Sequence, residues 1–311
     1  MKPKLILHIG THKTGTTTLQ TLMANHRASL AAQGFCYPTS GLPEVGTPRT
    51  DLAKHLLLTR SLIGEPDLFA RERDRLLAEF RASGASHLLL SEEGLAAPVV
   101  SRADGVEKLR VFAEEFDIQI VCLLRRQDMF AESLWAQRCK LGLTKDHVTK
   151  FVHRPNVRNY MTYKPMLDRW ATLGAVEAIA YEHAAAEGLV SRFSKAIGAT
   201  LTPLEDRNVS PSMDCAAMLA ALNARGRTKI GWQKVEKLLG PASRGKALGS
   251  RLRSEILADF ADHNAEMRAA YGVDFPATLP NEPEDPVAVP SLEEIRRIER
   301  LLDQKVLKRR G

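Results

Sequence analysis

A short apolar run near the amino terminus leads into a turn rich in glycine, threonine and lysine, and a helical pattern follows the turn. The composition of residues 5–9 predicts a buried strand, and the helix begins near Thr16. The loop from Thr11 to Gly15 can turn its backbone N–H groups inward, while the helix start adds free amides and the positive end of its dipole. Lys13 adds a positive charge, and neighbouring threonines add hydroxyl donors. This segment therefore predicts a binding site for a phosphate or a related anion.

The position of the lysine separates this loop from the common nucleotide-triphosphate loop, G-x-x-x-x-G-K-[S/T]. Gly10 and Gly15 have the spacing of that motif, but Thr16 occupies the lysine position and the lysine stands earlier, at Lys13. A nucleotide triphosphatase places its lysine on the terminal phosphates and the next hydroxyl on Mg²⁺. The displaced charge argues against that chemistry.

A second apolar run ends in two arginines. Residues 118–124 have the composition of a parallel strand covered on both faces, Arg125 and Arg126 follow, and a helix is predicted to start near Asp128. An arginine can bind a phosphate through two N–H groups, and Ser133, eight positions after Arg125, adds a neutral donor. The alternative is that the arginines are surface charges and that Ser133 faces solvent.

A third apolar run ends in two carboxylates. Residues 88–90 are followed by Ser91, Glu92 and Glu93. Ligands of open parallel sheets bind at the carboxyl ends of adjacent strands, so these side chains are expected to share one crevice with the loop. Adjacent strand residues point to opposite faces, and only one glutamate should reach a substrate as a base. The alternative is that both carboxylates stabilise the start of a helix.

These three segments together resemble the sulfotransferase superfamily. Residues 12–17, His-Lys-Thr-Gly-Thr-Thr, closely resemble its 5′-phosphosulfate-binding loop. Arg125 and Ser133 have the separation of its 3′-phosphate-binding element, and residues 91–93, Ser-Glu-Glu, are similar to the Ser-Ser-Glu of bacterial members. The motifs span less than half of the chain.

The resemblance implies a sulfotransferase that uses 3′-phosphoadenosine 5′-phosphosulfate (PAPS) as donor, releases adenosine 3′,5′-bisphosphate (PAP) and needs no metal. It implies Glu93 as the catalytic base, with Glu92 in reserve, and Lys13 as the group that neutralises the leaving oxygen. The implied donor-binding residues are Thr11, His12, Lys13, Thr14, Gly15, Thr16, Thr17, Arg125 and Ser133.

Two departures from the family pattern narrow the expected branch. Cytosolic eukaryotic members follow the threonine pair with a tryptophan that stacks on adenine, whereas this chain has Thr18. The glutamate pair also replaces their histidine. Both differences point away from the enzymes that act on small phenols and steroids and towards the glutamate-base group. The resemblance of the three segments implies a bacterial branch that acts on a hydroxyl, or an amine, of a carbohydrate or glycoconjugate. Two other functions stay open: a P-loop kinase or NTPase-like enzyme that needs Mg²⁺, and a non-catalytic nucleotide-binding protein.

Alternating apolar runs and helical patterns predict an α/β fold with a central parallel sheet flanked by helices, of P-loop-like three-layer type. Strands are expected at 5–9, 87–91, 118–124 and 176–181, and helices at 16–32, 67–83, 102–116, 160–173 and 184–197. We expect residues 1–210 to form a sulfotransferase nucleotide-binding core and residues 211–311 a helical C-terminal extension packed on the same domain. In that extension, Ser291 and Glu294 form a predicted capping box before a final amphipathic helix.

The composition excludes some other functions. The formal net charge is +7, but no nucleic-acid-binding motif accompanies it, so no nucleic-acid partner is expected. The four cysteines are far apart and show no metal-ligand spacing. No apolar run approaches the length of a membrane span, about 18 residues, and the expected compartment is the cytoplasm. A peripheral membrane contact and the oligomeric state stay open.

Overall fold

The computed structural model describes residues 2–43, 53–64, 66–102, 104–203, 210–240, 246–278 and 287–307. The chain divides into two compact units. The sheet unit contains Met1–Arg126, Thr162–Arg207 and Asp262–Pro276, and the helical unit contains Gln127–Met161, Asn208–Ala261 and Ala277–Gly311. This division does not follow a single boundary at residue 210, because the segment directly after the fourth strand packs with late helices of the chain.

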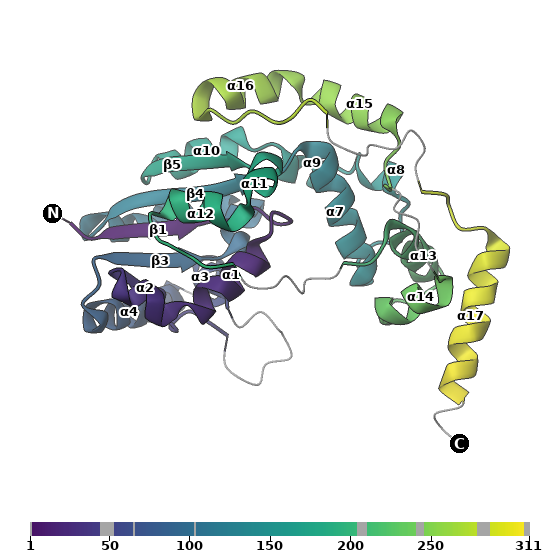
Figure 1. Cartoon of the computed structure of the whole chain (residues 1–311), viewed down its shortest axis with the longest axis horizontal. Helices are drawn as coiled ribbons and strands as arrows, with labels where there is room; N and C mark the ends of the chain where they lie inside the picture. The colour runs from purple at the N-terminus through teal and green to yellow at the C-terminus, as the bar shows by residue number, and fades with distance from the viewer. Residues whose placement is uncertain are drawn as a thin grey trace. The chain divides into compact units, whose positions relative to one another are not determined.

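The sheet unit is built on five parallel strands in the order β2-β3-β1-β4-β5. Leu5 of β1 is paired with Leu88 on one side and Ile118 on the other. Figure 1 shows the strands side by side. Four of them match the predicted runs, and β2 was missed because two residues give no measurable period. The strands are β1 (Lys4–His8), β2 (Phe35–Cys36), β3 (His87–Ser91), β4 (Asp117–Leu124) and β5 (Ala175–Ala180).

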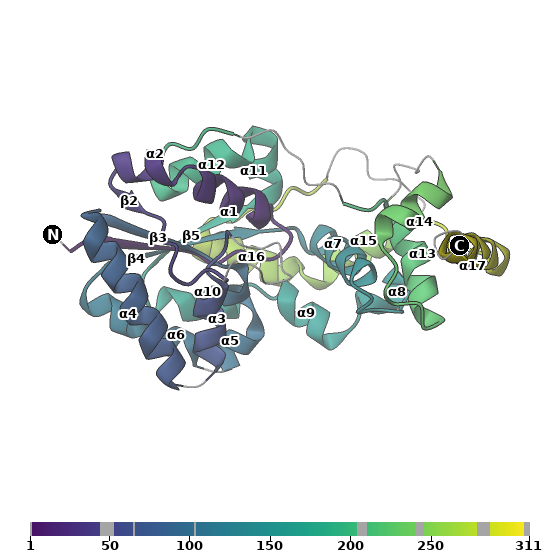
Figure 2. The same ribbon diagram turned by 90° about the horizontal axis from the view of Figure 1, so that it is seen from below.

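Helices cover both faces of this sheet, so the expected α/β fold with three layers is confirmed (Figure 2). Apolar side chains of the strands alternate between two core clusters, one under each helical layer. One layer contains α1 (Thr16–Asn25), α2 (Arg27–Ala32), α11 (Tyr181–Glu187) and α12 (Leu189–Ile197). The other contains α3 (Leu56–Ile63), α4 (Pro66–Ser83), α5 (Pro98–Arg102), α6 (Gly105–Lys108) and α10 (Lys164–Ala171).

Four of the predicted helices are interrupted. The pattern at 160–173 is divided between α9 (Pro155–Met161) and α10, which begins at Lys164. The pattern at 102–116 contains the short α6 followed by a 3₁₀ helix, Leu109–Glu114. The pattern at 16–32 is divided at His26, whose ring nitrogen Nδ1 is bonded to the Leu22 carbonyl oxygen over 2.9 Å. The pattern at 184–197 is divided at Gly188, which has a φ of +102°. A further helix of the sheet unit, α16 (Ala261–Tyr271), adds Met267 to one of the two cores.

The helical unit has a separate apolar core. Within it, α7 packs against α13 and α15. A buried guanidinium joins two of these helices: Arg253 Nη1 donates to Asp128 Oδ2 over 2.6 Å, and Arg253 Nη2 donates to Glu132 Oε1 over 2.9 Å. The helices are α7 (Gln127–Lys140), α8 (Val148–Phe151), α9 (Pro155–Met161), α13 (Met213–Ala224), α14 (Trp232–Leu239), α15 (Ser250–Asp259) and α17 (Leu292–Leu307).

The predicted capping box at the start of α17 is confirmed. The Ser291 hydroxyl accepts from the Glu294 N–H over 3.2 Å, and the Glu294 carboxylate accepts from the Ser291 N–H over 2.8 Å. The apolar stripe of this helix packs into the core of the helical unit through Ile298 and Leu302.

Candidate functional site

The predicted anion loop lies at the point where the order of the sheet reverses. After β1 the chain continues to β2 and β3 on one side of the sheet, and after β4 it continues to β5 on the other side. The carboxyl ends of β1 and β4 are adjacent, and the connections that leave them run in opposite directions. Beyond β1 the chain still follows β4: the Ile9 N–H donates to the Val121 carbonyl over 3.0 Å, and the Thr11 N–H donates to the Leu123 carbonyl over 2.8 Å. Open α/β sheets bind ligands at such a position.

Two threonine hydroxyls fix the shape of the loop. Thr14 Oγ1 donates to the Thr11 carbonyl oxygen over 2.7 Å, and Thr11 Oγ1 donates to the Leu123 carbonyl oxygen over 3.2 Å. Lys13 has a φ of +69°, in the left-handed region that non-glycine residues rarely adopt. Because both hydroxyls are used inside the protein, Thr11 and Thr14 shape the loop.

The loop ends at the amino terminus of α1. Gly15 is the residue before the helix and has a φ of +74°, a conformation that glycine adopts at little cost. Within the described part of the chain, no side chain caps α1 and no acidic residue stands in its first turn. The positive end of the helix dipole is therefore not compensated by a carboxylate of that turn, which favours an anion there.

Glu93 lies directly against the start of the loop. Gly10 has a φ of +101°, and a Cβ atom at this position would lie 2.8 Å from Glu93 Cβ and 2.9 Å from Glu93 Cα. Such distances are too short for carbon atoms, so glycine is required by the close approach of the two segments as well as by its φ. The loop and the end of β3 thus form one packed structure.

The Glu93 carboxylate is buried and fully engaged. Lys54 Nζ donates to Oε1 over 2.9 Å, Gln20 Nε2 donates to Oε2 over 2.8 Å, and His12 Nδ1 lies 4.0 Å from Oε1. Burial alone would raise the pKa of this carboxyl, but the Lys54 ammonium and the hydrogen bonds from Lys54 and Gln20 outweigh burial and lower the pKa to about 2. Glu93 is therefore held as a carboxylate.

Glu92 has a different role. Its Oε1 atom accepts from the Gly94 N–H over 2.9 Å, and it caps the short 3₁₀ helix of Glu93–Ala96. This is the helix-start role that the sequence left open for the pair. Glu93 contacts the anion loop at Gly10 and His12.

Arg125 joins β4 to the loop. Its Nη1 atom donates to the Lys13 carbonyl oxygen over 2.9 Å, and its guanidinium lies 5.1 Å from the centre of the Tyr181 ring. Arg125 Nε lies 3.8 Å from Glu182 Oε1, and the Tyr163 hydroxyl donates to the Arg125 carbonyl oxygen over 2.7 Å. The guanidinium thus supports the predicted anion loop.

Ser133, the predicted partner of Arg125, belongs to the helical unit. Ser133 stands on α7 and is half-buried. Arg125 belongs to the sheet unit, whose first segment ends one residue later, directly before α7. The other residues predicted for the site, from Thr11 to Thr17 together with Glu92 and Glu93, all lie in the sheet unit. Within the loop, Thr16 is buried and Thr17 is exposed.

Three contacts of the site were missed at the level of sequence. Lys54 precedes α3 and has no motif around it, whereas Gln20 is a buried polar residue on the mostly apolar buried face of α1. Glu182 follows the carboxyl end of β5, and its carboxylate accepts from the Arg126 N–H over 3.2 Å. The strand-end rule that located Glu93 and Arg125 also applies to Glu182, so this residue could have been found.

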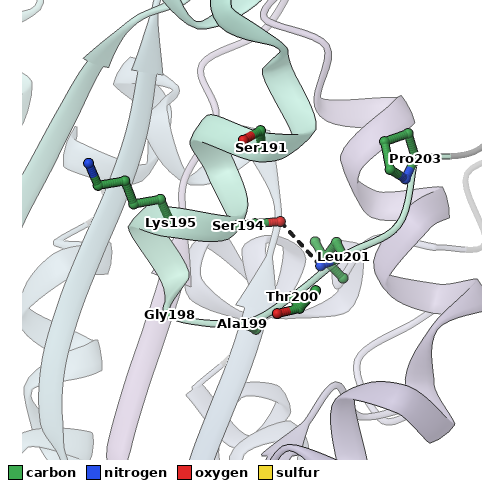
Figure 3. Close-up of a pocket in the computed structure, with 8 residues that line it drawn as sticks. All are labelled: Ser191, Ser194, Lys195, Gly198, Ala199, Thr200, Leu201 and Pro203. Carbon is green, nitrogen blue, oxygen red and sulfur yellow. Dashed lines mark hydrogen bonds between the residues drawn. The ribbon is translucent and has the colours of Figure 1, made fainter.

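A surface pocket of about 410 Å³ lies at the carboxyl end of α12 (Figure 3). Thr200 exchanges hydrogen bonds with the side chain of Gln33, which precedes β2, so the pocket is near the amino ends of the strands. Figure 3 also shows the Leu201 N–H donating to Ser194 Oγ over 3.3 Å. Among the described residues, none predicted for the site lines this pocket, whose lining is Ser191, Ser194, Lys195, Gly198, Ala199, Thr200, Leu201 and Pro203.

The described residues contain no cluster of three or more histidine, cysteine, aspartate or glutamate side chains placed to hold a metal ion. No helix in the described ranges has the length and apolar character needed to cross a membrane. All four cysteines are buried and none forms a disulfide.

Comparisons with known proteins assign no family to the chain. No protein-family model matches it, and no curated protein matches it. One solved structure that aligns with it comes from a study of the PezAT chromosomal toxin–antitoxin system of Streptococcus pneumoniae. That chain is 11% identical, the alignment covers 86% of this chain and 87% of the other, and the TM-score is 0.30. At that TM-score the alignment supports no functional inference.

Proposed function

We propose that this protein is a sulfotransferase that moves the sulfuryl group of PAPS to a hydroxyl, or an amine, of an acceptor. One observation carries the proposal: the loop with Lys13 at its middle is packed against Glu93 through Gly10 and is bonded to Arg125 through the Lys13 carbonyl. An anion loop, a carboxylate and an arginine from three separate strand ends therefore lie at one edge of the sheet.

The donor's 5′-phosphosulfate is proposed to bind the loop between Thr11 and Thr17. Backbone N–H groups, the start of α1 and the Lys13 side chain are suited to a group that carries negative charge on several oxygens. In the reaction, the acceptor oxygen attacks sulfur while the bond from sulfur to the bridging oxygen breaks. The electron pair stays on the 5′-phosphate oxygen of PAP, where Lys13 neutralises it, so the proposed reaction needs no metal ion.

The 3′-phosphate distinguishes PAPS from ATP and is assigned to Arg125 and Ser133. A guanidinium has five N–H donors, so Arg125 can bond the Lys13 carbonyl and still donate to a phosphate. Replacing Arg125 would weaken PAP binding either by disturbing the loop or by removing a contact to the 3′-phosphate. Ser133→Ala tests the contact to the 3′-phosphate by itself, because Ser133 stands on α7 and outside the loop. We expect it to weaken PAP binding by about threefold to tenfold.

Glu93 is the proposed base that takes the acceptor proton. Glu93→Gln should leave PAP binding intact and abolish transfer. Glu92→Gln should retain most transfer, because the Glu92 carboxylate caps a helix and an amide oxygen can also accept from the Gly94 N–H. If Glu92→Gln abolishes transfer and Glu93→Gln does not, the assignment within the pair is wrong.

The acceptor is proposed to be a carbohydrate or glycoconjugate, in the cytoplasm or at a membrane surface. The test is transfer of labelled sulfuryl from PAPS to a panel of saccharides, glycolipids and simple alcohols, without added metal. Lys13→Ala should slow transfer more than tenfold, and near-normal turnover would remove Lys13 from the mechanism. Phosphoryl transfer from Mg²⁺-ATP to the same panel would support the kinase alternative, and PAP binding without transfer to any acceptor would support a non-catalytic nucleotide-binding protein.

A further inference from the structure

Lys54 is held at the site by contacts on both sides of it in the chain. Before it, the Ala53 carbonyl oxygen accepts from the Tyr37 hydroxyl over 2.5 Å. After it, the His55 N–H donates to the Ser91 carbonyl and the Ser91 N–H donates to His55 Nδ1, both over 3.0 Å. The backbone at Lys54 is thus fixed to the end of β3, directly before the two glutamates.

The Lys54 ammonium lies against the carboxylates at the end of β3. Its Nζ atom is 2.9 Å from Glu93 Oε1 and 4.0 Å from Glu92 Oε1, and its side chain is only 13% exposed. His12 of the loop lies 4.0 Å from the same Glu93 oxygen. The two nitrogens from different segments therefore approach one carboxylate oxygen, and Lys54 is next to the place where an anionic donor would enter.

This ion pair conflicts with the role of Glu93 as a base. A carboxylate bonded to an ammonium and an amide has little affinity for a proton, and these contacts keep the Glu93 pKa far below neutral. A donor that brings further negative charge beside Glu93 offers the ammonium a second anionic partner. Transfer of the ammonium to that partner would return proton affinity to the carboxylate.

We propose that Lys54 is a donor-binding residue that exchanges partners: its ammonium pairs with Glu93 when the loop is empty and with the sulfuryl oxygens when PAPS is bound. This inference rests on the proposed sulfotransferase function and assigns a second cation to its donor site. In the transfer step, the proton of the acceptor hydroxyl moves to the released Glu93 carboxylate as the acceptor oxygen bonds to sulfur. The electron pair of the broken bond remains on PAP.

The experiment compares the affinities of PAPS and PAP, which differ by the sulfuryl group alone. In Lys54→Met, calorimetric titration should show PAPS binding weakened about tenfold or more, because an ionic hydrogen bond is lost. PAP binding should change by about threefold or less, which also shows that the variant is folded. Lys54→Arg should keep most of the preference for PAPS over PAP. Lys4→Met is the matched control, since Lys4 is exposed at the opposite end of β1.

A double-mutant cycle distinguishes partner exchange from a purely structural ion pair. Glu93→Gln releases Lys54 from its competing carboxylate and should strengthen PAPS binding relative to PAP. That gain should disappear when Glu93→Gln is combined with Lys54→Met. If the gain persists in the double variant, it reflects removal of a repulsive carboxylate and the proposed exchange is wrong.

The results separate this inference from the proposed function. If the wild-type protein binds neither PAP nor PAPS, the sulfotransferase proposal fails and the exchange fails with it. If both ligands bind and Lys54→Met leaves the ratio of their affinities unchanged, the donor site stands and the role of Lys54 is refuted. Glu93→Gln alone also tests the exchange: if it fails to strengthen PAPS binding relative to PAP, the exchange is refuted whether or not Lys54→Met folds.

Discussion

Replacing Gly10 by alanine tests the contact between the anion loop and the end of β3. The new Cβ atom would lie 2.8 Å from Glu93 Cβ and 2.9 Å from Glu93 Cα, and Gly10 has a φ of +101°. A backbone atom such as Cα cannot move aside as the end of a flexible side chain can. The substitution therefore combines an unfavourable backbone conformation with a steric overlap that only a shift of one segment can relieve.

The two effects can be given magnitudes. A non-glycine residue in a sparsely populated backbone region costs about 1–3 kcal/mol, and overpacking costs about 1–3 kcal/mol. Gly84→Ala is the matched control, because Gly84 has a φ of +64° and, among the described residues, no atom lies within 4 Å of the place that a Cβ would occupy there. Gly84→Ala should cost about 1–2 kcal/mol from the backbone alone, so Gly10→Ala should exceed it by about 1–3 kcal/mol.

The assay is denaturant unfolding of the wild type and both variants, followed by calorimetric titration with PAP. Gly10→Ala should lower the free energy of unfolding more than Gly84→Ala does, and it should weaken PAP binding. If the loop moves aside to relieve the overlap, the loss of stability shrinks and the loss of PAP binding grows. Equal stability of the two variants together with wild-type PAP binding by Gly10→Ala would refute the close approach of loop and carboxylate.

Three further predictions concern the framework. Arg253→Met should destabilise the protein by about 3–5 kcal/mol in denaturant unfolding, because it leaves two buried carboxylates without their cation. Arg251→Ala, at an exposed position of the same helix, should leave the stability nearly unchanged, and a similar loss in both variants would contradict the importance of the buried ion pairs. Burial lowers the pKa of His55 from 6.5 to about 4, so the unfolded state binds the extra proton first and stability falls as the pH drops from 6.5 to 4, by up to about 3 kcal/mol. His55→Gln should reduce that dependence in thermal melts at several pH values without abolishing it, because burial also lowers the pKa of His8 to about 4. An unchanged slope would contradict the contribution of His55. Ser291→Ala should cost about 1 kcal/mol through loss of the cap on α17, and no change in stability would show that the capping box contributes nothing.

The sheet could be predicted because its strands carry a strong local signal. The runs that became β1, β3, β4 and β5 are almost wholly apolar, as parallel strands covered by helices on both faces must be. The break at Gly188 was also visible in the sequence as a glycine inside a helical pattern. The break at His26 was not visible. It accompanies a contact between the His26 ring nitrogen and the Leu22 carbonyl, and the spacing of apolar residues carries no information about such a contact.

The site shows the same limit. Glu93, Arg125 and the loop were found because each directly follows an apolar strand, and the order of a parallel sheet brings strand ends together. Lys54 follows no strand. Its position depends on the hydrogen bonds between His55 and Ser91, which are far apart in the sequence, and no local sequence pattern predicts such a pairing. Residues that are placed at a site by long-range contacts of this kind can be identified only from the structure.

The most direct test of the central claim is calorimetric titration with PAP, beside ATP with and without Mg²⁺. The proposed sulfotransferase should bind PAP tightly without metal, and Arg125→Ala should weaken that binding at least about tenfold, since the guanidinium supports the loop and is assigned to the 3′-phosphate. Binding of Mg²⁺-ATP with no response to PAP would contradict the claim and favour a nucleotide-dependent kinase.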